Sequence, residues 1–127
     1  MMITRLTPNL YTDDVMACVQ FWTSRMGFMK TVEVPQEQGL AFAAMRCGSL
    51  ELMYGSFASL GKELGAAMPA KGPSFLFLEV DDVDAAFTAM KGAPVIVPMH
   101  KTFYGATEFT VTDPAGHFVT FAQFGKA

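Results

Sequence analysis

The chain has 127 residues, enough for one domain whose core needs no disulfide or metal for stability. Its nine Lys and Arg are scattered and its net charge is -3, which argues against nucleic acid as a partner. No apolar run has the length of a membrane span and no signal peptide pattern opens the chain, so we expect a cytoplasmic protein with no membrane partner. Hydrophobic residues make up 51%, including 12 Phe and 10 Met, which predicts an apolar cavity, a subunit interface or both.

The first part of the chain predicts a strand, a helix and three further strands. Residues 3–11 alternate loosely and are interpreted as a strand, with Pro8 indicating an edge position or a bend. An N-cap at residues 12–14 opens a helix whose apolar residues recur at helical spacing until Gly27. The three further strands are predicted at 29–34, 40–47 and 50–54.

The same order begins again after a connector at about residues 57–72, whose composition suggests a short helix or loop. The pattern predicts a strand at 75–80, a cap at Asp81-Asp82 and a helix that ends at Gly92. A strand at 95–97, a loop at 98–105 and a final hairpin follow.

The hairpin turns at the Asp-Pro-Ala-Gly sequence of residues 113–116. Phe109 and Val111 alternate before it, and Val119 and Phe121 alternate after it, as in half-buried strands. Proline presets φ for a turn and glycine permits a positive φ, so the sequence specifies the corner by a physical mechanism.

Sequence similarity supports a duplication. Residues 10–19 (LYTDDVMACV) and 78–87 (LEVDDVDAAF) are identical at five of ten positions without gaps, and the predicted elements share one order. A strand followed by any capped helix would show part of this similarity, but not the agreement of all five elements. The repeat is too long for a solenoid unit and indicates two paired modules, about 1–56 and 73–127.

The helix end VQFWTSRMGF (residues 19–28), the paired modules and DPAGH (residues 113–117) resemble the vicinal-oxygen-chelate superfamily, which contains glyoxalase I, extradiol dioxygenases and bleomycin resistance proteins. The resemblance covers essentially the whole chain and is closest to the bleomycin resistance branch. It implies one α+β domain of two tandem βαβββ modules whose curved mixed sheets cup a ligand cleft. It also implies a homodimer, in which modules are sometimes exchanged between chains.

Metal-dependent members of this superfamily carry one ligand on the first and one on the last strand of each module. The resemblance places Thr7, Glu51, Phe75 and Thr120 at these positions. Glu51 is the one strong ligand among them, because divalent transition metals need His, Cys or carboxylate groups. We therefore expect no metal and no cofactor.

Other reactive side chains form no recognisable constellation. Cys18 and Cys47 lack metal-ligand spacing and a basic neighbour, and are interpreted as reduced packing residues. His117 follows the turn, where a polar surface residue is common. His100 lies in the predicted loop near the cleft rim, where it is either a binding or acid-base group or a solvated residue.

Strand alternation then suggests which side chains face the cleft that the resemblance implies. The inward positions form an aromatic and methionine-lined groove with a few polar groups, suited to a flat or moderately apolar molecule. A carboxylate in such a groove is expected to have a raised pKa. The candidate ligand-binding residues are Asn9, Glu51, Met53, Phe75, Phe77, His100, Tyr104 and Thr120.

Structural alternatives remain open at this point. Phe75 and Phe77 also suit a core or a dimer interface, and Glu51 also suits an ion pair with Arg5 or Arg46. The function expected from the resemblance is a metal-independent protein of the antibiotic resistance type that sequesters an aromatic or polycyclic ligand in a cleft of a dimer. The alternative is an enzyme, a lyase or isomerase related to glyoxalase with a non-standard or absent metal site.

Overall fold

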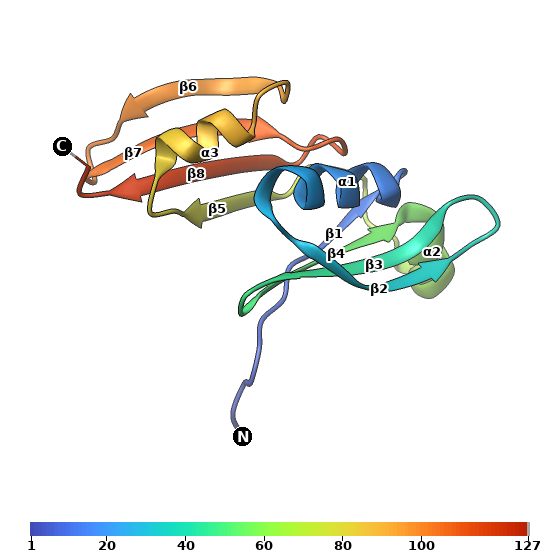
Figure 1. The fold of residues 1–127 in the computed structure, drawn as a ribbon. Coiled ribbons are helices and arrows are strands. Elements are labelled where there is room, and N and C mark those ends of the chain that lie inside the picture. The colour runs from blue at the N-terminus through green and yellow to red at the C-terminus, as the bar shows by residue number, and fades with distance from the viewer. Residues whose placement is uncertain (127) are drawn as a thin grey trace. The chain divides into compact units, whose positions relative to one another are not determined.

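The structure, a computed structural model, describes residues 1–126. The chain forms two compact units, Met1–Lys71 and the part from Gly72 onward. Each unit contains a four-stranded mixed sheet with a helix on one face (Figure 1). The expected α+β fold with two βαβββ modules is confirmed.

The first unit has the sheet order β1-β4-β3-β2. β1 pairs in parallel with β4, and the other two pairs are antiparallel. The elements are β1 (Asn9–Thr12), α1 (Val15–Met26), β2 (Met29–Pro35), β3 (Leu40–Cys47), β4 (Leu50–Ser56), α2 (Phe57–Leu64) and the short 3₁₀ helix η1 (Gly65–Ala67).

Helix α1 forms where its local sequence predicts it. The Asp14 carboxylate accepts a hydrogen bond from the Ala17 N–H (3.1 Å), and Gly27 ends the helix with a φ of 70°. Its apolar side packs against β3 and β4. Trp22 is fully buried there, and its indole N–H donates to the Tyr54 hydroxyl (2.8 Å). This contact fixes the helix on its sheet.

The second unit repeats the arrangement with the order β5-β8-β7-β6. The Asp82 carboxylate accepts from the Ala85 N–H (3.0 Å), the same cap as in α1. The helix covers one face of the sheet (Figure 1), where Phe109 and Phe121 are fully buried. The elements are β5 (Phe75–Glu79), α3 (Val83–Ala89), β6 (Val95–Lys101), β7 (Ala106–Thr112) and β8 (Phe118–Phe124).

Several predicted element boundaries are wrong. β4 continues to Ser56 instead of residue 54, and α3 ends at Ala89 instead of Gly92. β1 begins at Asn9 instead of residue 3, although the Pro8 carbonyl accepts a backbone hydrogen bond from the Met53 N–H (2.9 Å). β2 includes Pro35. β6 continues to Lys101, through the segment predicted as a loop. It is an edge strand, and its register with β7 shifts between Val97 and His100. An irregular edge tolerates a proline that lacks an N–H.

The predicted hairpin is present, and its turn is held by side chains. The Asp113 carboxylate accepts from the N–H groups of Ala115 (3.0 Å) and His117 (2.8 Å), and Gly116 has a φ of 85°. The prediction of His117 as a surface residue is wrong, because it is 3% exposed and its Nδ1 accepts from the Ser74 N–H (2.8 Å). His117 therefore ties the turn to the start of β5.

No helix within residues 1–126 is long and apolar enough to cross a membrane.

Candidate functional site

The face of the second sheet opposite α3 carries the densest group of candidate residues. Because Phe109 and Phe121 point toward the helix, alternation directs Glu108, Thr120 and their same-parity neighbours to the opposite, open face. The strand register sets Phe77 beside Thr120, and Thr120 beside Thr110. A second row runs from Glu79 through Ala122 and Glu108 to His100.

Aromatic rings cover one side of this open face. Phe75 is 74% exposed and its ring stacks on Phe118 with a centroid separation of 5.0 Å. Phe77 is 53% exposed and lies 6.4 Å from the Phe124 ring. Exposed rings of this size on a sheet face indicate a contact surface for a ligand or a partner, because apolar area in water is costly.

A polar cluster lies beside the rings. The Tyr104 hydroxyl donates to Glu108 Oε2 (2.6 Å), and His100 Nε2 lies 3.9 Å from Glu108 Oε1. The hydroxyls of Thr110 and Thr120 form a hydrogen bond of 2.7 Å. The side chain of Glu108 is mostly buried, so it is fixed in place by its neighbours.

The pKa of the Tyr104 phenol is raised above its ordinary value, first by the hydrogen bond to the Glu108 carboxylate and then by burial. The phenol therefore remains protonated near neutral pH and acts as a hydrogen-bond donor. His100 lies in strand β6 instead of the predicted loop, and its Nδ1 is 2.9 Å from the Pro98 carbonyl oxygen.

The candidates of the first unit form a separate polar group. Glu51 accepts hydrogen bonds from the Thr7 hydroxyl (3.0 Å) and from Arg5 Nη1 (3.1 Å). The expectation of a raised pKa for this carboxyl is wrong: the Thr7 hydroxyl, assisted by Arg5, holds the pKa of Glu51 below its ordinary value. Asn9 pairs in register with Met53, so both occupy the strand face that carries Glu51.

The residues at the superfamily's ligand positions do not fit a divalent metal. Glu51 is already bound by a hydroxyl and a guanidinium, and the Thr120 hydroxyl is bound by Thr110. The register places Thr120 beside Phe77, and Phe75 beside Phe118, neither of which offers a ligand atom. Within residues 1–126, no three His, Cys, Asp or Glu side chains gather in a way that could hold a metal ion.

Five of the eight predicted binding residues lie in the second unit and three in the first. The open face of the second sheet carries Phe75, Phe77 and Thr120. The side chains of His100 and Tyr104 both lie next to Glu108. Sequence reasoning missed Glu108, although a signal existed. It alternates with Phe109 and Val111 in a strand whose helix-facing side was already assigned, so its carboxylate had to point to the opposite face.

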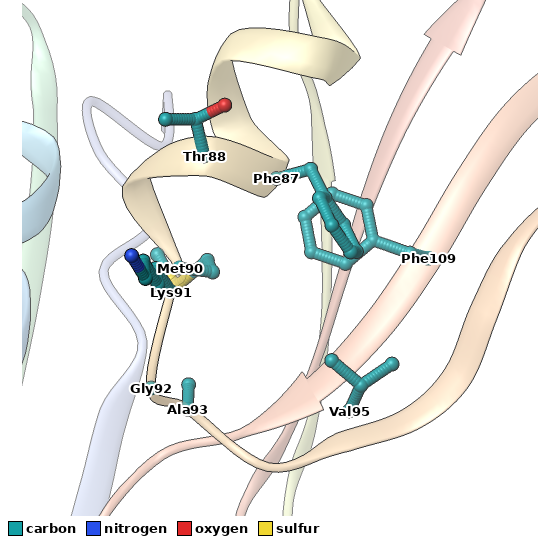
Figure 2. Close-up of a pocket in the computed structure, with 8 residues that line it drawn as sticks. All are labelled: Phe87, Thr88, Met90, Lys91, Gly92, Ala93, Val95 and Phe109. Atoms are coloured by element: carbon teal, nitrogen blue, oxygen red, sulfur yellow. The ribbon is translucent and has the colours of Figure 1, made fainter.

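A separate apolar pocket of about 400 Å³ lies on the helix side of the second unit. Figure 2 shows the rings of Phe87 and Phe109 next to each other, in an edge-to-face contact with centroids 5.0 Å apart. Val95 is directed toward the same space, and the Lys91 ammonium points away from both rings. The lining of the pocket includes one ionisable side chain, Lys91, and one hydroxyl, Thr88, and is otherwise apolar, so apolar contact dominates what it can bind.

Comparison with known proteins supports the fold. A solved structure of TioX from Micromonospora sp. ML1 matches with a TM-score of 0.77 at 21% identity, over 95% of this chain and 98% of TioX. A lactoylglutathione lyase from Agrobacterium tumefaciens matches with a TM-score of 0.76 at 21% identity, over 95% of this chain and 94% of that protein. The TM-scores establish similarity of fold, and at 21% identity they establish nothing beyond the fold.

Sequence comparison extends the similarity to the family level. An uncharacterised protein of Mycobacterium bovis is 27% identical over 124 residues, which cover 93% of this chain and 82% of that protein. The family model described as the Glyoxalase/Bleomycin resistance protein/Dioxygenase superfamily matches residues 3–121. The chain therefore belongs to the glyoxalase/bleomycin resistance protein/dioxygenase superfamily.

Proposed function

We propose that this protein binds a small aromatic or polycyclic molecule without the help of a metal, as bleomycin resistance proteins do. The supporting observation is the open face of the second sheet, where Phe75 and Phe77 are exposed beside the polar cluster of Tyr104, Glu108 and Thr120. Flat ligands pack on such rings, and the polar groups orient them. Sequestration of a toxic compound in the cytoplasm is the role that fits this chemistry.

The proposal treats the chain as one domain of two modules that acts as a homodimer. We also propose that three residues of the first unit, Asn9, Glu51 and Met53, take part in ligand binding. The lactoylglutathione lyase shares the fold at 21% identity, and a shared fold does not define an activity, so the argument depends on the residues of the site.

Calorimetric titration with naphthylmethanol, a neutral aromatic probe, tests the proposal. Calorimetry is preferable to intrinsic fluorescence, because Trp22 is fully buried in the core of the first unit. We expect Phe77→Ala to weaken binding about tenfold, which corresponds to about 1.4 kcal/mol of lost apolar contact.

Phe87→Ala is the matched control, because Phe87 is an exposed phenylalanine of the same unit that lines the helix-side pocket instead. It should leave the affinity within about twofold. Loss of binding in Phe87→Ala with retention in Phe77→Ala would place the probe in the pocket of Figure 2 and contradict the proposal. Absence of binding to the wild-type protein would also contradict it.

The second candidate is an acid-base enzyme of the lyase or isomerase type. The observation that favours it is the Glu108 carboxylate, fixed beside His100 and the Tyr104 phenol, since such a group can accept a proton from a bound substrate. Elemental analysis of protein purified without chelators tests whether such an enzyme depends on a metal. A stoichiometric metal that is lost in Glu51→Ala would favour the enzyme over the binding protein.

A further inference from the structure

One oxygen of the Glu108 carboxylate is left to accept a further hydrogen bond. Oε2 accepts from the Tyr104 hydroxyl (2.6 Å), whereas no hydrogen bond from residues 1–126 reaches Oε1. The neighbouring His100 Nε2 is 3.9 Å away, too far for a direct hydrogen bond. Among the described residues no buried side-chain oxygen lacks a hydrogen-bond partner, so Oε1 reaches the surface, where it can accept from a ligand.

The ring of His100 is oriented so that it offers a second acceptor to the same donor. Its Nδ1 lies 2.9 Å from the Pro98 carbonyl oxygen, and a carbonyl oxygen accepts only, so Nδ1 carries the hydrogen. The neutral imidazole then has its lone pair on Nε2, which faces Glu108. An amine nitrogen at about 2.9 Å from each acceptor can bridge a gap of 3.9 Å.

Aromatic rings next to these acceptors favour a positive charge on that donor. The Tyr104 ring lies 6.1 Å from the Phe124 ring, which in turn lies 6.4 Å from the Phe77 ring. All three are between 42% and 53% exposed. Ring faces attract organic cations, and a carboxylate among the rings strengthens that attraction.

We propose that Glu108 Oε1 and His100 Nε2 bind the protonated amine of an aromatic ligand whose ring system lies against Phe77 and Phe124. This inference rests on the proposed function and adds to it the class of ligand, an alkylamine that carries an aromatic ring system. The Tyr104 phenol has a positioning role, because its hydrogen bond to Oε2 directs Oε1 toward the ligand.

Binding of such a ligand depends on pH through His100. In acid the imidazolium loses its acceptor at Nε2, pairs with Glu108 and repels the ammonium. Two other ionisable groups lie on the same face as His100: Tyr104, which is bonded to Glu108, and Glu79, which is separated from Glu108 by Ala122. Lys101 is the next residue in the strand, and alternation directs it to the opposite face. Affinity for the amine should therefore be lower in acid than near neutral pH.

The experiment compares two probes that differ in one group, naphthylmethylamine, which is cationic at neutral pH, and naphthylmethanol, which is neutral. Calorimetry should show the wild-type protein binding the amine at least about tenfold more tightly than the alcohol. Glu108→Gln should abolish this preference by lowering the affinity for the amine, because the neutral amide no longer attracts the ammonium group, while its oxygen can still accept from Tyr104. Glu63→Gln, at an exposed position of α2, changes the net charge equally and should preserve the preference.

His100→Gln supplies an independent test. It should retain amine binding near neutral pH within about threefold and lose the decline in acid, because glutamine keeps an acceptor but does not titrate. Equal affinity of the wild-type protein for both probes, or an unchanged preference in Glu108→Gln, would overturn the amine site while leaving aromatic binding intact. Binding of neither probe would instead overturn the proposed function.

Discussion

At the scale of single residues, the surroundings of Glu51 explain how a carboxylate at one of the superfamily's metal-ligand positions can serve another role. The Thr7 hydroxyl and the Arg5 guanidinium both donate to its Oε1 and stabilise the carboxylate. Both interactions favour the charged form, so the pKa of Glu51 is lowered even though the sheet face around it includes apolar groups.

This environment predicts the effect of Thr7→Val. Loss of the hydroxyl donor, the largest contribution to the shift, should raise the pKa of Glu51 toward its ordinary value, and a carbon-detected NMR titration of the side-chain carboxyl measures it. Because the folded-state pKa is depressed, the stabilisation is present above the unfolded-state pKa and is lost as pH falls through the folded-state value. Thr7→Ser retains a hydroxyl and should keep the low value. An unchanged titration midpoint in Thr7→Val would show that Arg5 alone sets the shift.

The site residues that follow from the pattern of a single strand were predictable, and those that depend on the pairing between strands were not. Phe75, Phe77 and Thr120 follow from strand alternation within β5 and β8, and the structure places all three on the open face of the second sheet. The bonds of Glu108 were not predictable in the same way. They depend on which residues β6 and β7 bring opposite one another, and that register includes a shift near His100.

At the scale of elements, the two modules begin their helices by the same device. Asp14 caps α1 and Asp82 caps α3, each accepting a hydrogen bond from the residue three positions later. The preceding aspartates, Asp13 and Asp81, are exposed and do not cap. Sequence alone predicted both helices because the cap and the apolar spacing are local signals. The terminal glycine marks the end of α1 at Gly27, whereas α3 ends at Ala89, before Gly92.

We expect Asp14→Ala and Asp82→Ala each to lower the free energy of unfolding by about 1 kcal/mol, the usual cost of a lost N-cap. Urea denaturation monitored by circular dichroism measures the change. Asp13→Ala and Asp81→Ala are matched controls that remove the same charge next to the same helix end. If the controls were as destabilising as the cap variants, the effect would come from charge near the helix terminus instead of the capping hydrogen bond.

The strand ends were harder to predict than the helices. Residues 3–8 alternate like a strand, yet pairing with β4 begins at Asn9. The β6 segment contains Pro98, which argued for a loop, but an edge strand has one side without a pairing partner in the sheet and accommodates the missing N–H. Both errors have one cause: the position of a strand within its sheet is a tertiary property, which periodicity does not report.

At the scale of the whole molecule, apolar side chains at the sheet edges support the proposed homodimer. Edge strand β2 exposes Met29, Val32 and Val34, and edge strand β6 exposes Val95 and Ile96. A long edge strand with exposed apolar residues is a template for pairing with another chain, and natural proteins usually cover or charge such edges. We expect a second copy of the chain to cover these apolar side chains and remove them from water.

The dimer gives a prediction that discriminates between the two edges. Sedimentation velocity over a wide range of protein concentration should show a dimer, and Val34→Lys or Ile96→Lys should shift the population to monomer according to which edge is covered. Lysine at an exposed edge position should leave the folding of the monomer intact, because both side chains are already in contact with water. Met16→Lys, at an exposed position of a helix instead of an edge strand, is the control and should remain dimeric. A monomer at every concentration of the wild-type protein would contradict the homodimer, and a dimer that survives both edge substitutions would place its interface on other surfaces of the two units.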